Sequence, residues 1–237
     1  MNRHSRAFTL AALGLALALA LGIGPAAPAL SKPGLQVPPL FELRQRPPQP
    51  SPPQPSLVFA YRGWRVDAAR AARAQPAART VRQIRAQIDL VERLDLRPDV
   101  MAFMRSQPIY GDGLAAAGAE AGAYAPGGGV VLHVRRLDPK KPTLLYALLK
   151  AYQAQRLPGG LDNPDVAGLR RQSAARHVWP RDALMLQGND EFFALTAAAY
   201  LYGTITREPY TRADLKKTEP QCYQWLANLF DGGRPRV

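Results

Sequence analysis

The spacing of apolar residues predicts strands and helices in alternation over the first part of the domain and helices over the rest. Leu57–Tyr61 and Trp64–Val66 are rich in β-branched and aromatic residues and flank Arg62-Gly63, which is typical of a short hairpin. A helix is expected over Thr80–Leu94, because its apolar residues recur at steps of three and four. The residues that carry this step are Val81, Ile84, Ile88 and Val91.

The pattern continues with a short helix over Pro98–Ser106 and a short strand at Pro108–Tyr110. The Gly- and Ala-rich stretch 111–129 is expected to be a long loop, and it lacks the GxxxxGK[ST] pattern of a phosphate-binding loop. Val130–Val134 follows as a strand. Thr143–Arg156 is apolar over a wide arc, which predicts a central, buried helix.

The second half of the chain is expected to be mostly helical. A weaker, basic helix is predicted over 163–177, and Asn189 is expected to cap a helix over Asp190–Tyr202. Two short helices follow, with capping-box-like starts at Thr211 and Thr218. We therefore expect an α+β fold with a small sheet in the N-terminal half, a buried central helix and helices covering one side.

The chain ends add little to this domain. Arg3 and Arg6 precede an apolar run and an Ala-Pro-Ala sequence, so residues 1–29 are predicted to be a cleaved signal peptide; a retained signal anchor is the alternative. Residues 30–56 hold nine of the 23 prolines and are predicted to form an extended, disordered tether. The folded domain is expected over 57–231, with a flexible tail at 232–237.

Composition narrows the function. We expect an exported protein, periplasmic or extracellular, without a membrane span once the signal is removed. Cys222 is the single cysteine, so an intramolecular disulfide and a cysteine-based zinc site are excluded. The net charge of +13 comes from dispersed arginines without an aromatic ladder, and we expect no specific nucleic-acid partner.

Two segments carry a resemblance to a known family. The first reads Leu-Leu-Tyr-Ala-Leu-Leu-Lys-Ala-Tyr over 144–152, and the second reads Asn-Asp-Glu-Phe-Phe-Ala over 189–194. This order resembles bacterial zinc-dependent peptidases of the zincin, gluzincin-like class. In that family the buried helix reads L-L-H-E-x-x-H-A-Y-H, and a later N-x-x-E-F-F-A helix supplies the third zinc ligand. The resemblance covers roughly residues 57–231.

The resemblance implies a degenerate active site. Tyr146 and Lys150 stand in the two histidine positions, Ala147 stands in the position of the general base, and Glu191 matches the third ligand. A catalytic zinc needs three protein ligands, and alanine cannot accept a proton from water. The remaining histidines, His133 and His177, are not four residues apart. We therefore expect no catalytic, cofactor-binding or metal-binding residues, with zinc binding lost.

Lys150 and Glu191 allow two interpretations. They could form an ion pair that stands in for the metal, with Tyr146 hydrogen-bonding into the same pocket. Alternatively, Lys150 could extend to solvent, and Glu191 could be an acidic residue in the first turn of its helix, where the helix dipole favours a negative charge.

Other candidate residues have weaker support. Asp89 and Glu92 share one face of a predicted helix and could form a carboxylate pair, although a solvated face paired with nearby arginines such as Arg82, Arg85 and Arg93 is more usual. Ser173 and Thr196 show no pattern of nucleophile and base, and Cys222 is expected to be a core residue.

The expected function is that of a non-catalytic peptidase-like protein, a pseudoenzyme that binds peptide or protein. An edge strand beside the active helix binds extended peptide in zincins, which implies strand addition at Val130–Val134. Two alternatives stay open. One is a metallopeptidase with non-standard ligands. The other is a basic envelope protein that binds anionic polymers through a group of arginines, namely Arg170, Arg171, Arg176 and Arg181.

Overall fold

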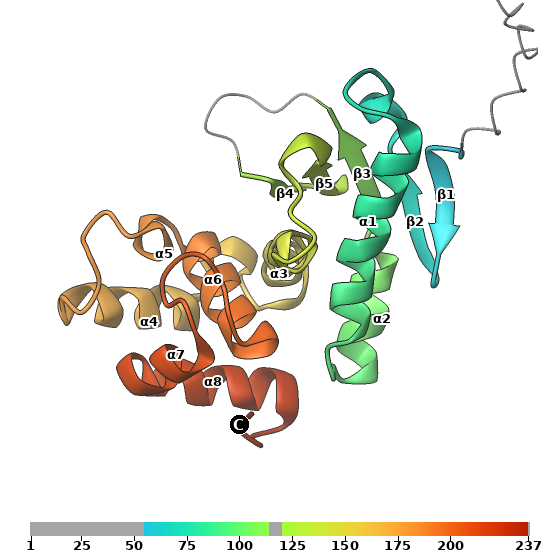
Figure 1. Ribbon diagram of the computed structural model, residues 1–237. Helices are drawn as coiled ribbons and strands as arrows, with labels where there is room; N and C mark the ends of the chain where they lie inside the picture. The colour runs from blue at the N-terminus through green and yellow to red at the C-terminus, as the bar shows by residue number, and fades with distance from the viewer. Residues whose placement is uncertain (1–54, 114–119, 237) are drawn as a thin grey trace, which may run out of the picture. The chain divides into compact units, whose positions relative to one another are not determined.

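A computed structural model describes residues 55–113 and 120–236 of the chain (Figure 1). The expected signal peptide and nearly all of the proline-rich tether lie outside these residues. The predicted α+β fold is confirmed, and within the described residues all strands lie in the N-terminal half of the domain, with two α-helices between the second and third strands.

Five short strands form one mixed sheet in the order β1-β2-β3-β5-β4. Antiparallel pairing joins β1 to β2 and β4 to β5, whereas β2, β3 and β5 run parallel. The strands are β1 (Val58–Tyr61), β2 (Trp64–Asp67), β3 (Ile109–Asp112), β4 (Gly122–Ala125) and β5 (Gly129–His133).

The predicted hairpin at the start of the domain is confirmed. Arg62 and Gly63 both have positive φ values, 49° and 82°, as a tight two-residue hairpin turn requires. A short 3-10 helix (Ala69–Arg73), α1 (Ala77–Glu92) and α2 (Pro98–Ser106) then connect β2 to β3. Helix α1 begins three residues before the expected start, because Pro76 accepts the first backbone bonds and alanine continues a helix without apolar periodicity.

The prediction of a loop over 111–129 was wrong in part. Strand β3 extends to Asp112, and Gly122–Ala125 is strand β4. The small residues of β4 are typical of a loop. One of them, Gly122, is required by the packing of the strand. A Cβ on Gly122 would lie 2.8 Å from the carbonyl oxygen of Thr143, so only glycine lets β4 approach helix α3 (Thr143–Arg156) this closely.

The expectation that Val130–Val134 is an edge strand was also wrong. Strand β5 lies between β3 and β4, so β4 and β1 form the edges of the sheet. Val134 belongs to a 3-10 helix (Val134–Arg136) rather than to the strand. The position of β5 inside the sheet could not be predicted from the sequence, because its partner β4 lies within the Gly- and Ala-rich stretch 111–129 that resembles a loop.

Helix α3 is the buried central helix that the apolar pattern predicted. It contacts β4, β5, α1 and α6 (Asn189–Tyr202). Six of its apolar side chains are at most 1% exposed: Leu144, Leu145, Ala147, Leu148, Leu149 and Ala151. Figure 1 shows α3 between the sheet and the C-terminal helices.

The second half consists of short helices around α6. They are α4 (Pro164–Ala175), α5 (Leu184–Gln187), α7 (Arg212–Thr218) and α8 (Pro220–Asp231), with a 3-10 turn at Gly160–Asp162. Thr211 caps α7 as predicted. Asn189 and Thr218 do not cap their helices, because Gly188 and Glu219 occupy the N-cap positions.

The end of the chain, which we expected to be flexible, makes defined contacts up to Arg236. This side chain forms a bidentate ion pair with Asp231 at 2.8 Å, and its carbonyl accepts a hydrogen bond from Tyr223. Across 55–113 and 120–236, no helix is long and apolar enough to cross a membrane.

Candidate functional site

Helices α3 and α6 bring together the residues that the family resemblance singled out. Tyr146 and Lys150 lie one turn apart on α3, and Glu191 lies in the first turn of α6. Lys150 forms ion pairs with Glu191 and, at 3.0 Å, with Asp190. The Tyr146 hydroxyl donates a hydrogen bond to the second carboxylate oxygen of Glu191. These contacts match the interpretation in which an ion pair stands where zinc ligands would meet.

The ion pair is largely withdrawn from solvent. The side chains of Lys150 and Glu191 are 14% and 16% exposed, so the lysine does not extend into solvent as the alternative required. The ammonium also lies 4.9 Å from the centre of the Tyr146 ring, a cation–π distance. One cation therefore serves two carboxylates and one aromatic face.

Tyr146 is held as a proton donor in this arrangement. Burial, followed by its hydrogen bond to Glu191 and the negative charges of Glu191, Glu120 and Asp190, raises the pKa of Tyr146 well above its ordinary value. The phenol therefore stays neutral at physiological pH, and it can donate to a carboxylate but cannot act as a base there.

Ala147, which the resemblance implies stands in the position of a general base, is fully buried. A Cβ on Gly122 would lie 3.5 Å from its methyl group, which places Ala147 where β4 packs on α3. It carries no group that could take a proton from water. As arranged, the cluster can hold charge and donate a hydrogen bond.

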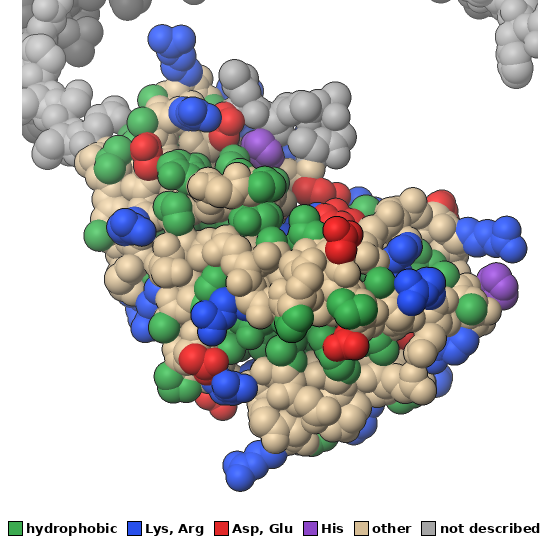
Figure 2. All heavy atoms as spheres, turned by 180° about the vertical axis from the view of Figure 1, so that it is seen from behind, with side chains coloured by type: hydrophobic (Ala, Val, Ile, Leu, Met, Phe, Trp, Pro, Cys, Tyr) green, Lys and Arg blue, Asp and Glu red, His purple; other side chains and the backbone are tan. Residues whose placement is uncertain are grey.

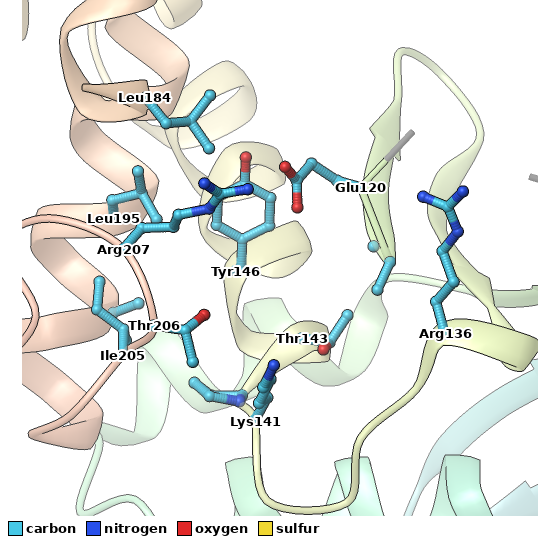
Figure 3. A pocket seen from close by; sticks show the side chains of 14 residues that line it. Glu120, Arg136, Lys141, Thr143, Tyr146, Leu184, Leu195, Ile205, Thr206 and Arg207 are labelled. Carbon is cyan, nitrogen blue, oxygen red and sulfur yellow. The ribbon is translucent and has the colours of Figure 1, made fainter. Parts of the chain in front are cut away.

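A cavity of about 230 Å³ opens beside this cluster (Figure 3). Tyr146 forms part of its wall. The remaining lining residues come from the approach to β4, the start of α3, and the segments around α5 and α6: Glu120, Ala121, Gly122, Arg136, Lys141, Pro142, Thr143, Leu184, Leu195, Ala198, Ile205, Thr206 and Arg207.

Gln87 supports one side of this cavity, and we had not identified it from the sequence. Its fully buried amide donates to the carbonyls of Asp138 and Lys141 at 2.8 and 2.9 Å and accepts from the backbone N–H of Leu144 at 3.0 Å. It thereby fixes the turn that leads into α3. The available signal was a polar residue on the apolar face of a helix, three residues after Ile84.

The two histidines lie apart from this cluster. His133 ends β5, and its buried Nδ1 has no hydrogen-bond partner among the described residues. His177 is exposed and has a positive φ of 53°. Within the part of the chain that the structure describes, no three His, Cys, Asp or Glu side chains are grouped as a metal site would require.

Asp89 and Glu92 have separate partners. Asp89 pairs with Arg62 at 3.0 Å, and Glu92 pairs with Arg105 at 2.6 Å and accepts from the Trp64 indole. The hydrogen bond from Arg105 is the largest cause of the lowered pKa of Glu92. Both carboxylates therefore join elements of the fold, and their partners are not the arginines of α1 that we had expected.

The four arginines that were expected to bind anionic polymers differ in their contacts. Arg170 donates to Asn189 and to the carbonyl of Leu186, both at 2.9 Å, and Arg176 pairs with the buried Glu219. Arg171 and Arg181 are exposed. Two of the four guanidinium groups thus bind within the protein, which reduces the charge available for an anionic polymer. On the face shown in Figure 2, the Lys and Arg side chains are scattered among other side chains.

The hydroxyl and thiol candidates are also engaged in the core. Ser173 donates to Glu219 at 2.7 Å, and Thr196 donates to the carbonyl of Phe192 at 2.7 Å. Cys222 is buried, as expected, and this burial raises the pKa of its thiol to about 12. The carboxylate that Ser173 contacts is itself buried and paired with Arg176.

Comparison with protein-family models, curated proteins and solved structures produced no match. The zincin resemblance therefore rests on the sequence motifs of this chain alone.

Proposed function

We propose that this chain is an exported, non-catalytic protein with a zincin-like fold that binds extended peptide or protein. The observation that carries the proposal is the convergence of Tyr146, Lys150 and Glu191. Residues 40 or more positions apart meet in the arrangement that the family resemblance implies, and the ammonium of Lys150 supplies a positive charge beside Glu191.

The replacement of ligands explains why we propose a binding function. A protonated lysine repels a divalent cation, and the buried Ala147 offers no general base. The scaffold keeps an edge strand beside the central helix, namely β4 rather than β5, with a cavity at its start. Such an edge offers unpaired backbone groups to an extended peptide.

Restoring the ligands tests the zincin-like assignment. The double variant Tyr146→His/Lys150→His places two imidazoles one turn apart opposite Glu191, which is a three-ligand zinc set. We expect it to bind one zinc per chain by calorimetry and atomic emission, and we expect adding Glu191→Gln to weaken that binding by at least about tenfold. A folded double variant without zinc affinity would contradict the assignment. One zinc per wild-type chain would favour the alternative of an active metallopeptidase.

Strand addition is tested at Tyr124 of β4. The change Tyr124→Pro removes a backbone N–H that points away from β5, and proline is tolerated on an edge strand. The matched control Tyr124→Ala removes the same side chain and keeps the N–H. In a fluorescence assay with a labelled library of random nonapeptides, we expect Tyr124→Ala to bind and Tyr124→Pro to lose binding. Equal binding by both variants would contradict strand addition.

A further inference from the structure

The cavity lies at one particular end of the edge strand. Three of its lining residues lie where β4 begins, because Glu120 and Ala121 directly precede the strand and Gly122 is its first residue; Thr143 and Tyr146 line the cavity from α3. Figure 3 shows Glu120 and Tyr146 at the same opening. A peptide that pairs with β4 would therefore place one of its ends at the cavity.

The hydrogen-bond register shows which backbone groups of β4 face outward. His133 donates its N–H to Ala121 at 2.9 Å, and the register pairs Ala123 with Val131. Bonded and non-bonded pairs alternate in an antiparallel ladder, so the N–H and C=O groups of Gly122 and Tyr124 point away from β5. An antiparallel peptide bound to them would have its C-terminus beside Gly122, at the cavity.

The mouth of the cavity is positively charged. Lys141 and Arg207 are exposed side chains that line it, and neither makes an ion pair within the described residues 55–113 and 120–236. Their backbones are held in place by bonds from Gln87 at 2.9 Å and from the N–H of Tyr210 at 2.7 Å. Glu120 contributes a single opposing carboxylate (Figure 3).

The floor of the cavity is apolar. Leu195, Ala198 and Ile205 are buried there, and Leu184 is half-buried. Its volume of about 230 Å³ falls below the range of about 300–1,000 Å³ that is usual for pockets holding whole small molecules. It is suited to one apolar side chain.

We propose, building on the peptide-binding function above, that this cavity recognises the C-terminal residue of a peptide. The peptide runs antiparallel to β4, its last side chain is apolar and enters the cavity, and its free carboxylate binds Lys141 and Arg207. An internal acidic side chain would place its charge on the apolar floor, at a desolvation cost. A parallel peptide would bring its terminal ammonium against two cations.

Two nonapeptide libraries test this proposal, each randomised at the last four positions. One has a free C-terminal carboxylate and the other is amidated. We expect the free acids to bind at least about tenfold more tightly, with an apolar last residue enriched, because the amide loses the charge-assisted bonds. Equal binding of acid and amide would overturn this inference and leave the strand-addition proposal standing. Absence of binding by both libraries would overturn the two together.

Matched variants locate the effect. Lys141→Gln/Arg207→Gln is expected to reduce binding of the free acids to the level of the amides and to leave the amides unchanged. Lys140→Gln removes a neighbouring exposed charge that does not line the cavity, and it should preserve the preference for the acid. Thr206→Trp, at an exposed lining position, should block both libraries, whereas the exposed, non-lining Thr204→Trp should not. A preference for acids that survives Lys141→Gln/Arg207→Gln would contradict the assignment of these residues.

Discussion

Glu191 and Glu219 are two carboxylates held between helices, and their surroundings differ. Glu219 is 2% exposed and accepts hydrogen bonds from Ser173 at 2.7 Å, from the Trp179 indole at 2.8 Å and from Arg176. Two neutral donors and one cation satisfy it entirely from within the protein, as a buried carboxylate requires.

Glu191 has one hydroxyl donor and one ammonium, which it shares with Asp190. Its hydroxyl donor, Tyr146, also lines the cavity. The comparison indicates that Glu219, which two neutral donors and Arg176 satisfy within the core, stabilises the fold. The carboxylate of Glu191 instead shares one cation with Asp190 and is linked to the cavity through Tyr146, which is the arrangement that the proposed site requires. The following changes test this difference.

The largest effect is expected at the structural carboxylate. Glu219→Ala leaves the Ser173 hydroxyl and the Trp179 indole without an acceptor, and we expect it to lower the free energy of unfolding by about 3 kcal/mol. Urea denaturation followed by circular dichroism measures this loss. Glu208→Ala is the control, because the side chain of Glu208 accepts a hydrogen bond from the exposed Tyr210, and it should change stability by less than about 0.5 kcal/mol. Similar losses of unfolding free energy in both variants would contradict a structural role for Glu219.

A smaller effect is expected at the ion pair of the site. Lys150→Met leaves Glu191 and Asp190 side by side without their cation, and we expect a loss of about 2 kcal/mol at neutral pH. The exposed Lys140→Met serves as the control and should be nearly neutral. A neutral Lys150→Met would mean that the lysine does not stabilise the two carboxylates, and the comparison with Glu219 would fail.

The smallest effect concerns Tyr146 and depends on pH. Tyr146→Phe removes one hydrogen bond to Glu191 and should cost about 1 kcal/mol at pH 7. The pKa of Tyr146 is raised in the folded protein, so its stabilising contribution is complete below the unfolded value near 10 and is lost as pH rises above it, at about 1.4 kcal/mol per pH unit.

Phenylalanine does not ionise, so the difference between the variant and the wild type should narrow above about pH 10 and reverse near about pH 11. Urea denaturation at pH 7, 9, 10 and 11 measures it. The raised pKa values of Tyr152, Tyr200 and Tyr223 act equally in both proteins. A constant difference over this range would show that Tyr146 is not held in its neutral form by the site.

Long periodic segments could be predicted from the sequence, and short segments of small residues could not. Helix α3 was identified because its wide apolar arc has only one stable place, the core. Strand β4 was missed because Gly122 and Ala123 carry no apolar pattern, and their value lies in the close approach to Thr143. The wrong prediction of an edge strand has the same cause. Without β4 in the predicted sheet, β5 would have no partner on one side and would be an edge strand.

The candidate site divides in the same way. The replacement of zinc ligands was evident from Tyr146, Ala147 and Lys150, because the chemistry of a residue type does not depend on its surroundings. Whether Lys150 pairs with Glu191 was left open, and the role of Gln87 was missed. Both depend on contacts between segments more than 40 residues apart.

The sequence by itself determined the α+β order, the buried central helix and the residue types available for chemistry, because periodicity and side-chain chemistry are local properties. The tertiary structure alone decided that β4 rather than β5 is an edge strand, that one lysine pairs with two carboxylates, and that a cavity opens at the start of β4. These features arise where distant segments pack together, and packing depends on shape and register that no local pattern encodes.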